Sequence, residues 1–194
     1  MALTPSTMLP LGTPAPAFRL PEPATGRQVS LTDFSVAPAM VVSFLCNHCP
    51  YVLHLRAALA EFGRECARRG VAFVGINAND VARYAEDRPE RMAEFTRTSG
   101  WTFPYLFDES QEVARAYKAA CTPDFFLFNP SRELAYRGQF DDSRPGNGRP
   151  ITGANLRAAL EDVLAGRPVS GPQLPSLGCN IKWKPGAEPA YAQP

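Results

Sequence analysis

Apolar residues recur along the middle of the chain in two patterns. Apolar runs of strand length, broken only by Ser43 and Gly75, fall at 39–45, 71–76 and 125–128, and such runs are typical of strands buried on both faces of a sheet. After the first run, apolar residues return at three- and four-residue steps from Pro50 to about Arg69, which predicts an amphipathic helix. The order strand, helix, strand predicts parallel pairing through a right-handed crossover.

Weaker patterns predict the rest of the chain. We expect a short strand at 28–31, helices at about 88–99, 111–119 and 152–165, an extended segment at 103–107 and a hairpin strand at 134–140. Prolines cluster at the two ends of the sequence, where they interrupt any regular pattern. The sequence therefore predicts an N-terminal extension over 1–26, one α/β domain over 27–166 and an irregular C-terminal tail over 167–194.

Composition narrows the class of protein. Of the 194 residues, 45% are hydrophobic, enough for a sizeable core, and the formal net charge is only +1, so no basic excess indicates a nucleic-acid partner. No apolar run approaches the roughly 20 residues that span a bilayer, and the N-terminus lacks the pattern of a signal peptide. We therefore expect a cytoplasmic protein with neither a membrane nor a nucleic acid as partner, in which a reducing environment keeps most of the five cysteines as thiols.

The candidate chemistry lies where the first apolar run ends. Cys46-Asn47-His48-Cys49 separates that run from the long helical pattern, and a Cys-x-x-Cys at a strand-to-helix junction indicates a redox dithiol. A zinc site is the other interpretation, but it needs two more ligands at close spacing. The remaining cysteines are single, so redox chemistry is favoured and no metal is expected.

Local physics suggests roles for the two thiols. A free thiol has a pKa of roughly 8.5, and the start of a helix lowers it by favouring the thiolate. If the helix begins near Cys46, that thiol becomes the attacking thiolate on the outer side of the loop, and Cys49 resolves the mixed disulfide from a less exposed position. A protonated His48 would assist; alternatively it is a solvated loop residue with no effect on thiol acidity.

The order of elements and several motifs resemble the thioredoxin-like superfamily over about residues 11–165. The opening Gly-Thr-Pro-Ala-Pro-Ala-Phe at 12–18, Trp-Thr-Phe-Pro at 101–104 and Phe-Asp-Glu at 107–109 look like the redoxin, or AhpC/TSA, branch. Cys-Asn-His-Cys-Pro-Tyr at 46–51 and Gly-Cys-Asn-Ile-Lys-Trp-Lys at 178–184 look like a bacterial subgroup of thioredoxin-family proteins. The fold class that this resemblance implies is a central mixed β-sheet flanked by helices.

The resemblance also implies a substrate groove. In this fold a cis-proline loop lies beside the dithiol and offers its backbone to an extended substrate, so Pro123 is expected to be cis, with Thr122 facing Cys46. An X-Pro bond is the place where a cis peptide costs least. The usual Gly-Pro between the two cysteines is replaced by Asn47-His48, which resembles oxidising or isomerising relatives and leaves the direction of electron flow open.

Three further cysteines need an interpretation. Cys66 shares the apolar stripe of the long helix and is expected to be a small core residue. Cys121, two residues before Pro123, is either a third redox thiol or a buried structural one. Cys179, in the tail, could resolve a sulfenate or disulfide formed at Cys46, or it could be a free or buried thiol.

Three functions follow from these residues. The first is a thiol-disulfide oxidoreductase that uses Cys46 and Cys49, needs no cofactor, and exchanges electrons with a protein or small-molecule disulfide and a donor dithiol protein. The second is a peroxiredoxin-like thiol peroxidase, although Ser43 and Ala39 replace the threonine and proline of that motif, and Arg137 is only a candidate to orient peroxide.

The third function is non-enzymatic: a metal- or haem-handling module that uses the two cysteines with His48 or Cys121. Substrate, reductant and oligomeric state are not predicted by the sequence.

Overall fold

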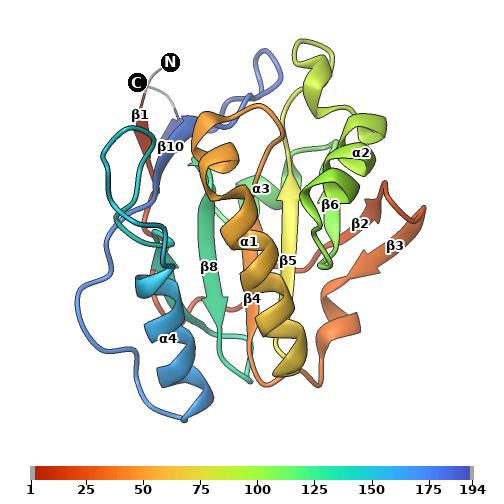
Figure 1. Cartoon of the computed structure of the whole chain (residues 1–194). Helices are drawn as coiled ribbons and strands as arrows, with labels where there is room; N and C mark the ends of the chain where they lie inside the picture. Colours follow the sequence, from red (N-terminus) through yellow and green to blue (C-terminus); the bar gives the residue numbers. More distant parts are fainter. Residues whose placement is uncertain (1–2, 193–194) are drawn as a thin grey trace.

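The structure, a computed structural model, describes residues 3–192 and is built around a five-stranded sheet in the order β6-β5-β4-β8-β9 (Figure 1). Its strands are β4 (Met40–Phe44), β5 (Ala72–Asn77), β6 (Tyr105–Phe107), β8 (Asp124–Phe128) and β9 (Leu134–Gly138). β4, β5 and β6 are parallel, whereas β8 and β9 are antiparallel to their neighbours. The predicted α/β fold with a central mixed sheet is confirmed.

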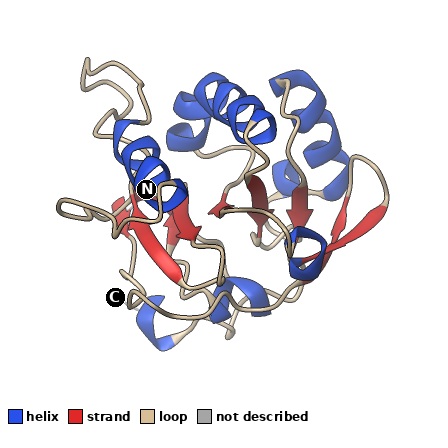
Figure 2. Ribbon diagram, turned by 90° about the horizontal axis from the view of Figure 1, so that it is seen from below, coloured by secondary structure: helices blue, strands red, loops and turns tan. Residues whose placement is uncertain are grey.

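Helices cover both faces of this sheet (Figure 2). α1 (Pro50–Arg68), α2 (Pro89–Ser99) and α4 (Ala154–Leu164) pack on one face, and the short α3 (Glu112–Ala116) packs on the other. Alternate residues of β4 divide between the two cores, because successive side chains of a strand point to opposite faces. Val41 contacts the core under α1, whereas Met40 and Val42 contact the core that includes α3.

The long helix α1 forms where the sequence predicted it. Pro50 occupies the first turn, where its missing N–H is not needed. The apolar positions at three- and four-residue steps are all buried: Val52, Leu55, Leu59, Phe62 and Cys66. The helix ends before Gly70, whose φ of +68° lies in the left-handed region that glycine adopts readily.

α3 is shorter than predicted. The expected helix at 111–119 forms only over Glu112–Ala116, because Gln111 and Lys118 have φ values of 64° and 49°. These left-handed conformations interrupt a right-handed helix at both ends.

Short elements complete the chain at its beginning and between β5 and α2. β2 (Arg19–Glu22) and β3 (Arg27–Ser30) form an antiparallel hairpin. Two 3-10 helices, η1 (Leu31–Phe34) and η2 (Ala85–Asp87), follow β3 and precede α2.

The prediction of an irregular C-terminal tail is wrong for its central part. β10 (Leu177–Asn180) pairs with β1 (Leu3–Pro5) on one side and β7 (Cys121–Thr122) on the other, and a further 3-10 helix, η3, spans Ala190–Ala192. Ile181 and Trp183, which follow β10, are buried in the core that includes α3. The domain boundaries at 26 and 166 stay predictions. Among the described residues, no helix is long and apolar enough to cross a membrane.

Candidate redox site

The two cysteines of the Cys-x-x-Cys motif lie between β4 and α1. β4 ends at Phe44, and the Leu45 backbone N–H still donates to the Ile76 carbonyl (2.9 Å), which holds the chain at the sheet before it turns. Cys49 is the N-cap of α1, so Cys46 lies three residues before the N-cap and four before the first helical residue, Pro50. The strand-to-helix junction is as predicted, but the helix begins at Pro50 and not near Cys46, where it was expected.

The motif cysteines contact Thr122 of the cis-proline loop. The Cys46 sulfur lies 3.3 Å from the Thr122 hydroxyl, and the Cys49 sulfur lies 3.1 Å from the Thr122 carbonyl oxygen. The Thr122–Pro123 peptide bond is cis, as the resemblance implied. Strand pairing thus brings a segment more than 70 residues away into contact with both thiols.

A third cysteine completes the group of thiols. The Cys179 sulfur lies 2.9 Å from the Cys49 sulfur, because β10 pairs Cys179 with Thr122. All three cysteines are almost fully buried, with 1% of Cys46, none of Cys49 and 2% of Cys179 exposed. The tail strand therefore lies against the edge of the cis-proline loop that was expected to receive an extended substrate.

The acidic thiol of this group is Cys49. The pKa of Cys49 is lowered to about 5, first by a hydrogen bond from Cys46 and then, against the effect of burial, by one from Cys179 and by the backbone N–H groups of Val52 and Cys179. The Thr122 carbonyl oxygen favours a protonated Cys49, but these donors outnumber it. Negative charge in the reduced protein therefore lies on the helix N-cap.

The exposure and the ionisation of Cys46 differ from those expected from the sequence. Burial raises the pKa of Cys46 well above its usual range, and the hydrogen bond to Cys49 and the negative charge of Asp87 act in the same direction. The expectation of an exposed, ionised Cys46 is wrong for this conformation, because α1 begins at Pro50 and a buried carboxylate lies beside the thiol.

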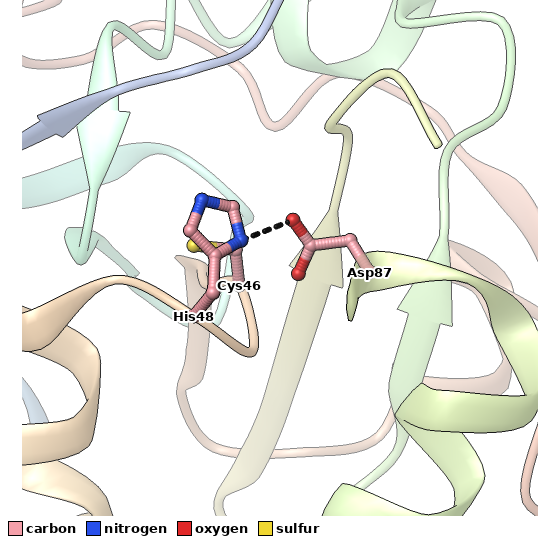
Figure 3. A group of neighbouring side chains, drawn as sticks. All are labelled: Cys46, His48 and Asp87. Carbon is pink, nitrogen blue, oxygen red and sulfur yellow. Dashed lines mark ion pairs between the residues drawn. The ribbon is translucent and has the colours of Figure 1, made fainter. Parts of the chain in front are cut away.

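That carboxylate belongs to Asp87, the last residue of η2, and it pairs with His48. His48 Nδ1 lies 2.8 Å from Asp87 Oδ2 (Figure 3). Asp87 also accepts hydrogen bonds from the Asn47 backbone N–H (2.7 Å) and the Asn79 side-chain amide (2.8 Å). Ligand atoms of Cys46, His48 and Asp87 all lie within 4.8 Å of one another, which makes them a candidate proton-transfer or metal-ligating group.

The pair shifts the titration of both partners. The hydrogen bond to Asp87 raises the pKa of His48 against the effect of partial burial. Burial alone would raise the pKa of Asp87, but the hydrogen bonds from His48, Asn79 and Asn47 outweigh it, and the pKa is lowered. His48 also stacks on Tyr84, with ring centroids 5.5 Å apart. It is therefore held in place rather than solvated as an independent loop residue.

Sequence reasoning did not identify Asp87 or the buried Asp124. Asp87 lies in a polar stretch before Arg88-Pro89, where nothing distinguishes it from a solvated carboxylate. Asp124 directly follows the cis-proline, and burial raises its pKa well above the usual range. A charged residue at the start of the apolar run 125–128 was the available signal, because carboxylates are rarely buried there without a role.

The two remaining cysteines lie elsewhere. Cys66 is in the core under α1, and burial raises its pKa to about 12. Cys121 is buried with its sulfur 3.7 Å from the Pro123 carbonyl oxygen, and burial raises its pKa well above the usual range. The structure favours the interpretation of Cys121 as a structural thiol.

The sheet order, the dithiol at the start of α1 and the adjacent cis-proline define a thioredoxin-like protein of the redoxin branch. Within that class, the chain belongs to the AhpC/TSA family, whose sequence model matches residues 11–137. A conserved protein of Geobacillus kaustophilus is 50% identical, with a TM-score of 0.94 over 96% of this chain and 99% of that one. A protein of Sinorhizobium meliloti 1021 is also 50% identical, with a TM-score of 0.92 over 94% of this chain and all of the other.

More distant relatives have names that point to redox chemistry. A Mycobacterium tuberculosis H37Rv protein, provisionally named a peroxiredoxin, is 32% identical over 117 residues, which are 60% of this chain and 69% of the relative. A Chlorobium tepidum protein provisionally named the thiol:disulfide interchange protein DsbE shares the fold, with 20% identity and a TM-score of 0.64 over 80% of this chain and 99% of that one. Together with the family match, these relatives indicate an oxidoreductase.

Proposed function

We infer that this protein is a thiol-disulfide oxidoreductase that uses Cys46 and Cys49 as its redox pair. The observation that carries the proposal is the hydrogen-bonded dithiol at the N-terminus of α1, with one thiol strongly acidified beside a cis-proline. An acidified thiol is a better leaving group and is more often ionised, and both properties favour exchange.

The proposed reaction begins at Cys46. Its proton passes along the hydrogen bond to the Cys49 thiolate, and the Cys46 sulfur attacks a substrate disulfide, releasing one substrate thiolate. Cys49 then loses that proton and displaces the second substrate thiolate, which closes the Cys46–Cys49 disulfide. The substrate disulfide is reduced and the protein dithiol is oxidised. The single proton of the dithiol ends on one substrate thiolate, and the other substrate thiolate takes its proton from water.

The proposed supporting residues are Asn47, His48, Thr122 and Pro123. His48 is linked to the buried Asp87 and lies within 4.8 Å of the Cys46 sulfur, so the pair is suited to accept or return a proton there. The Thr122 hydroxyl contacts the Cys46 sulfur directly. Asn47 holds the loop through its side-chain hydrogen bond to the Glu86 carbonyl (2.7 Å).

Burial of the dithiol limits which partners reach it. Since Cys46 is 1% exposed, a protein disulfide needs local opening of the covering segments, whereas a small disulfide needs less. We propose both as substrates, with a donor dithiol protein as reductant. The proposed location is the cytoplasm, whose reducing conditions return such a dithiol to its reduced form.

Single substitutions test the proposal. Rapid reduction of an insulin disulfide should be lost in Cys46→Ser, because the attacking thiol is gone. Cys66→Ser is the matched control, because it removes a buried thiol of the same helix-side core that lies outside the redox group. Equal loss of activity in both variants would contradict the assigned roles.

Peroxide reduction is the second candidate, supported by the AhpC/TSA match and by the relative provisionally named a peroxiredoxin. Cys46 would be oxidised to a sulfenate, and Cys49 would condense with it to give a disulfide and water. Arg137, the candidate to orient peroxide, instead donates from its guanidinium to Gln173 Oε1 (2.6 Å). Peroxide-dependent oxidation of a donor thiol no faster than that of a free thiol would remove this candidate.

The metal-handling alternative keeps one supporting observation, the group formed by Cys46, His48 and Asp87. Thiolate, imidazole and carboxylate are all zinc ligands. Metal analysis of dialysed protein tests it, since stoichiometric zinc or copper would favour binding over exchange.

A further inference from the structure

We propose that Cys179 is a third redox residue, and that it forms a disulfide with Cys49 rather than with Cys46. This inference rests on the proposed exchange chemistry and extends it. The two sulfurs lie 2.9 Å apart, whereas a disulfide bond is about 2.05 Å long, so the bond needs only a small further approach.

The fold holds Cys179 in this place by close packing of β10 on the cis-proline loop. The residue before it is Gly178, and a Cβ atom there would lie 2.0 Å from the Thr122 carbonyl oxygen. The same carbonyl oxygen lies 3.1 Å from the Cys49 sulfur. Absence of a side chain at 178 therefore lets the strand approach close enough to bring the Cys179 sulfur to Cys49.

Cys49 is the central sulfur of the three. It hydrogen-bonds to Cys46 on one side and to Cys179 on the other. The flanking thiols have different surroundings: Cys46 faces His48 and Asp87, whereas Cys179 belongs to a strand paired with β1. A central sulfur with a thiol on each side is suited to bond with either of them in turn.

The step itself is a disulfide exchange within the protein. After the Cys46–Cys49 disulfide has formed, the Cys179 thiolate attacks the Cys49 sulfur, the Cys46–Cys49 bond breaks, and Cys46 leaves as a thiolate that takes up the proton lost by Cys179. No external oxidant is needed, because one disulfide replaces another. Cys46 is thereby free again, and the donor dithiol reduces the Cys49–Cys179 bond.

Disulfide mapping tests the inference directly. Wild type, Cys46→Ser and Cys179→Ser are equilibrated with oxidised glutathione, acid-quenched, alkylated and digested with trypsin without reduction. No lysine or arginine lies between Arg27 and Arg56 or between Arg167 and Lys182. A Cys46–Cys49 bond therefore stays within one peptide, whereas a Cys49–Cys179 bond joins two, and fragmentation separates it from a Cys46–Cys179 bond.

We expect the joined peptides in Cys46→Ser as the main product, both linkages in wild type, and only the internal linkage in Cys179→Ser. Wild type provides the measurement that does not depend on the folding of a variant. If wild type and Cys46→Ser give glutathione adducts but no joined peptides, the inference is overturned. The proposed function still stands in that case if Cys179→Ser forms the internal linkage. Absence of the internal linkage from both wild type and Cys179→Ser would instead overturn the proposed function. It would also overturn the relay, that is, the exchange of the Cys46–Cys49 bond for the Cys49–Cys179 bond.

Discussion

At the scale of single residues, the chemistry of the site depends on which of the two buried thiols, Cys46 or Cys49, carries the negative charge. The thiolate lies on Cys49 because hydrogen-bond donors converge on its sulfur, and Cys46 stays protonated because it is buried beside Asp87. Two neighbouring thiols with pKa values moved in opposite directions are suited to different roles in one reaction.

Removal of the Cys179 thiol tests this sharing of charge. Cys179→Ala deletes the side-chain hydrogen bond through which Cys179 lowers the pKa of Cys49. A hydrogen bond to a charged group contributes roughly 1.5–3 kcal/mol, so the pKa of Cys49 should rise by roughly one to two units. The ultraviolet absorbance of the thiolate measured against pH gives this pKa. Cys66→Ala serves as the control, and an equal pKa in both variants would show that Cys179 does not stabilise the thiolate.

The His48–Asp87 pair predicts a pH window for stability. The raised pKa of His48 means that its contribution is complete below the unfolded value of roughly 6.5 and is lost as pH rises through the folded pKa. The lowered pKa of Asp87 means that its contribution is present above roughly 3.9 and is lost as pH falls through the folded pKa. The charge of Glu86 raises the pKa of His48 and that of Lys182 lowers it, and neither residue belongs to the pair.

We therefore expect His48→Ala to cost about 1–3 kcal/mol of unfolding free energy near pH 5.5, and less at a pH above the raised pKa that His48 has in the folded protein. Urea unfolding of both proteins at the two pH values measures the difference. A cost that does not change with pH would show that the histidine contributes by packing on Tyr84 and not by its charge.

At the scale of elements, the sequence predicted the helices and strands that are determined by residues close together in the chain. The central strand and the following helix were evident because β4 is apolar on both faces and α1 has a continuous buried stripe. β10 was missed because Leu177–Asn180 has no alternating apolar pattern, and its partner β7 has only two residues. Pairing between segments so far apart leaves no local signal, and the contact between Cys49 and Cys179 depends on it.

A substitution at Gly178 tests the role of β10. Gly178→Ala places a methyl group against the Thr122 carbonyl oxygen, which belongs to the backbone and cannot move aside like a side chain. We expect a loss of roughly 1–3 kcal/mol in unfolding free energy and a lower yield of the Cys49–Cys179 linkage. Gly171→Ala is the control, since a Cβ there meets no atom within 4 Å and only its φ of +80° costs energy, about 1 kcal/mol. Equal effects of the two variants would show that close packing at 178 is unimportant.

At the scale of the whole molecule, the tail connects the end of the chain to the redox site. Cys179 lies in the core under α1, whereas Ile181 and Trp183 lie in the core on the other face of the sheet. A segment that contributes to both cores cannot be treated as a separable appendage, so a covalent bond to it should affect the stability of the whole fold.

The two disulfides therefore predict different gains in stability. Cys49 and Cys179 are 130 positions apart. In the chain-entropy treatment, the entropy lost by closing so long a loop raises the free energy of the unfolded chain by about 5 kcal/mol at 25 °C. Cys46 and Cys49 are neighbours in one loop, and the same treatment gives about 2 kcal/mol. Urea unfolding of the oxidised and the reduced protein measures the gain in unfolding free energy on oxidation. We expect the larger gain for Cys46→Ser, which forms the Cys49–Cys179 bond, and the smaller for Cys179→Ser, which forms the Cys46–Cys49 bond. The reverse order would mean that bonding to Cys179 strains the folded state by more than the loop closure contributes, and β10 would then be too rigid to act in a relay.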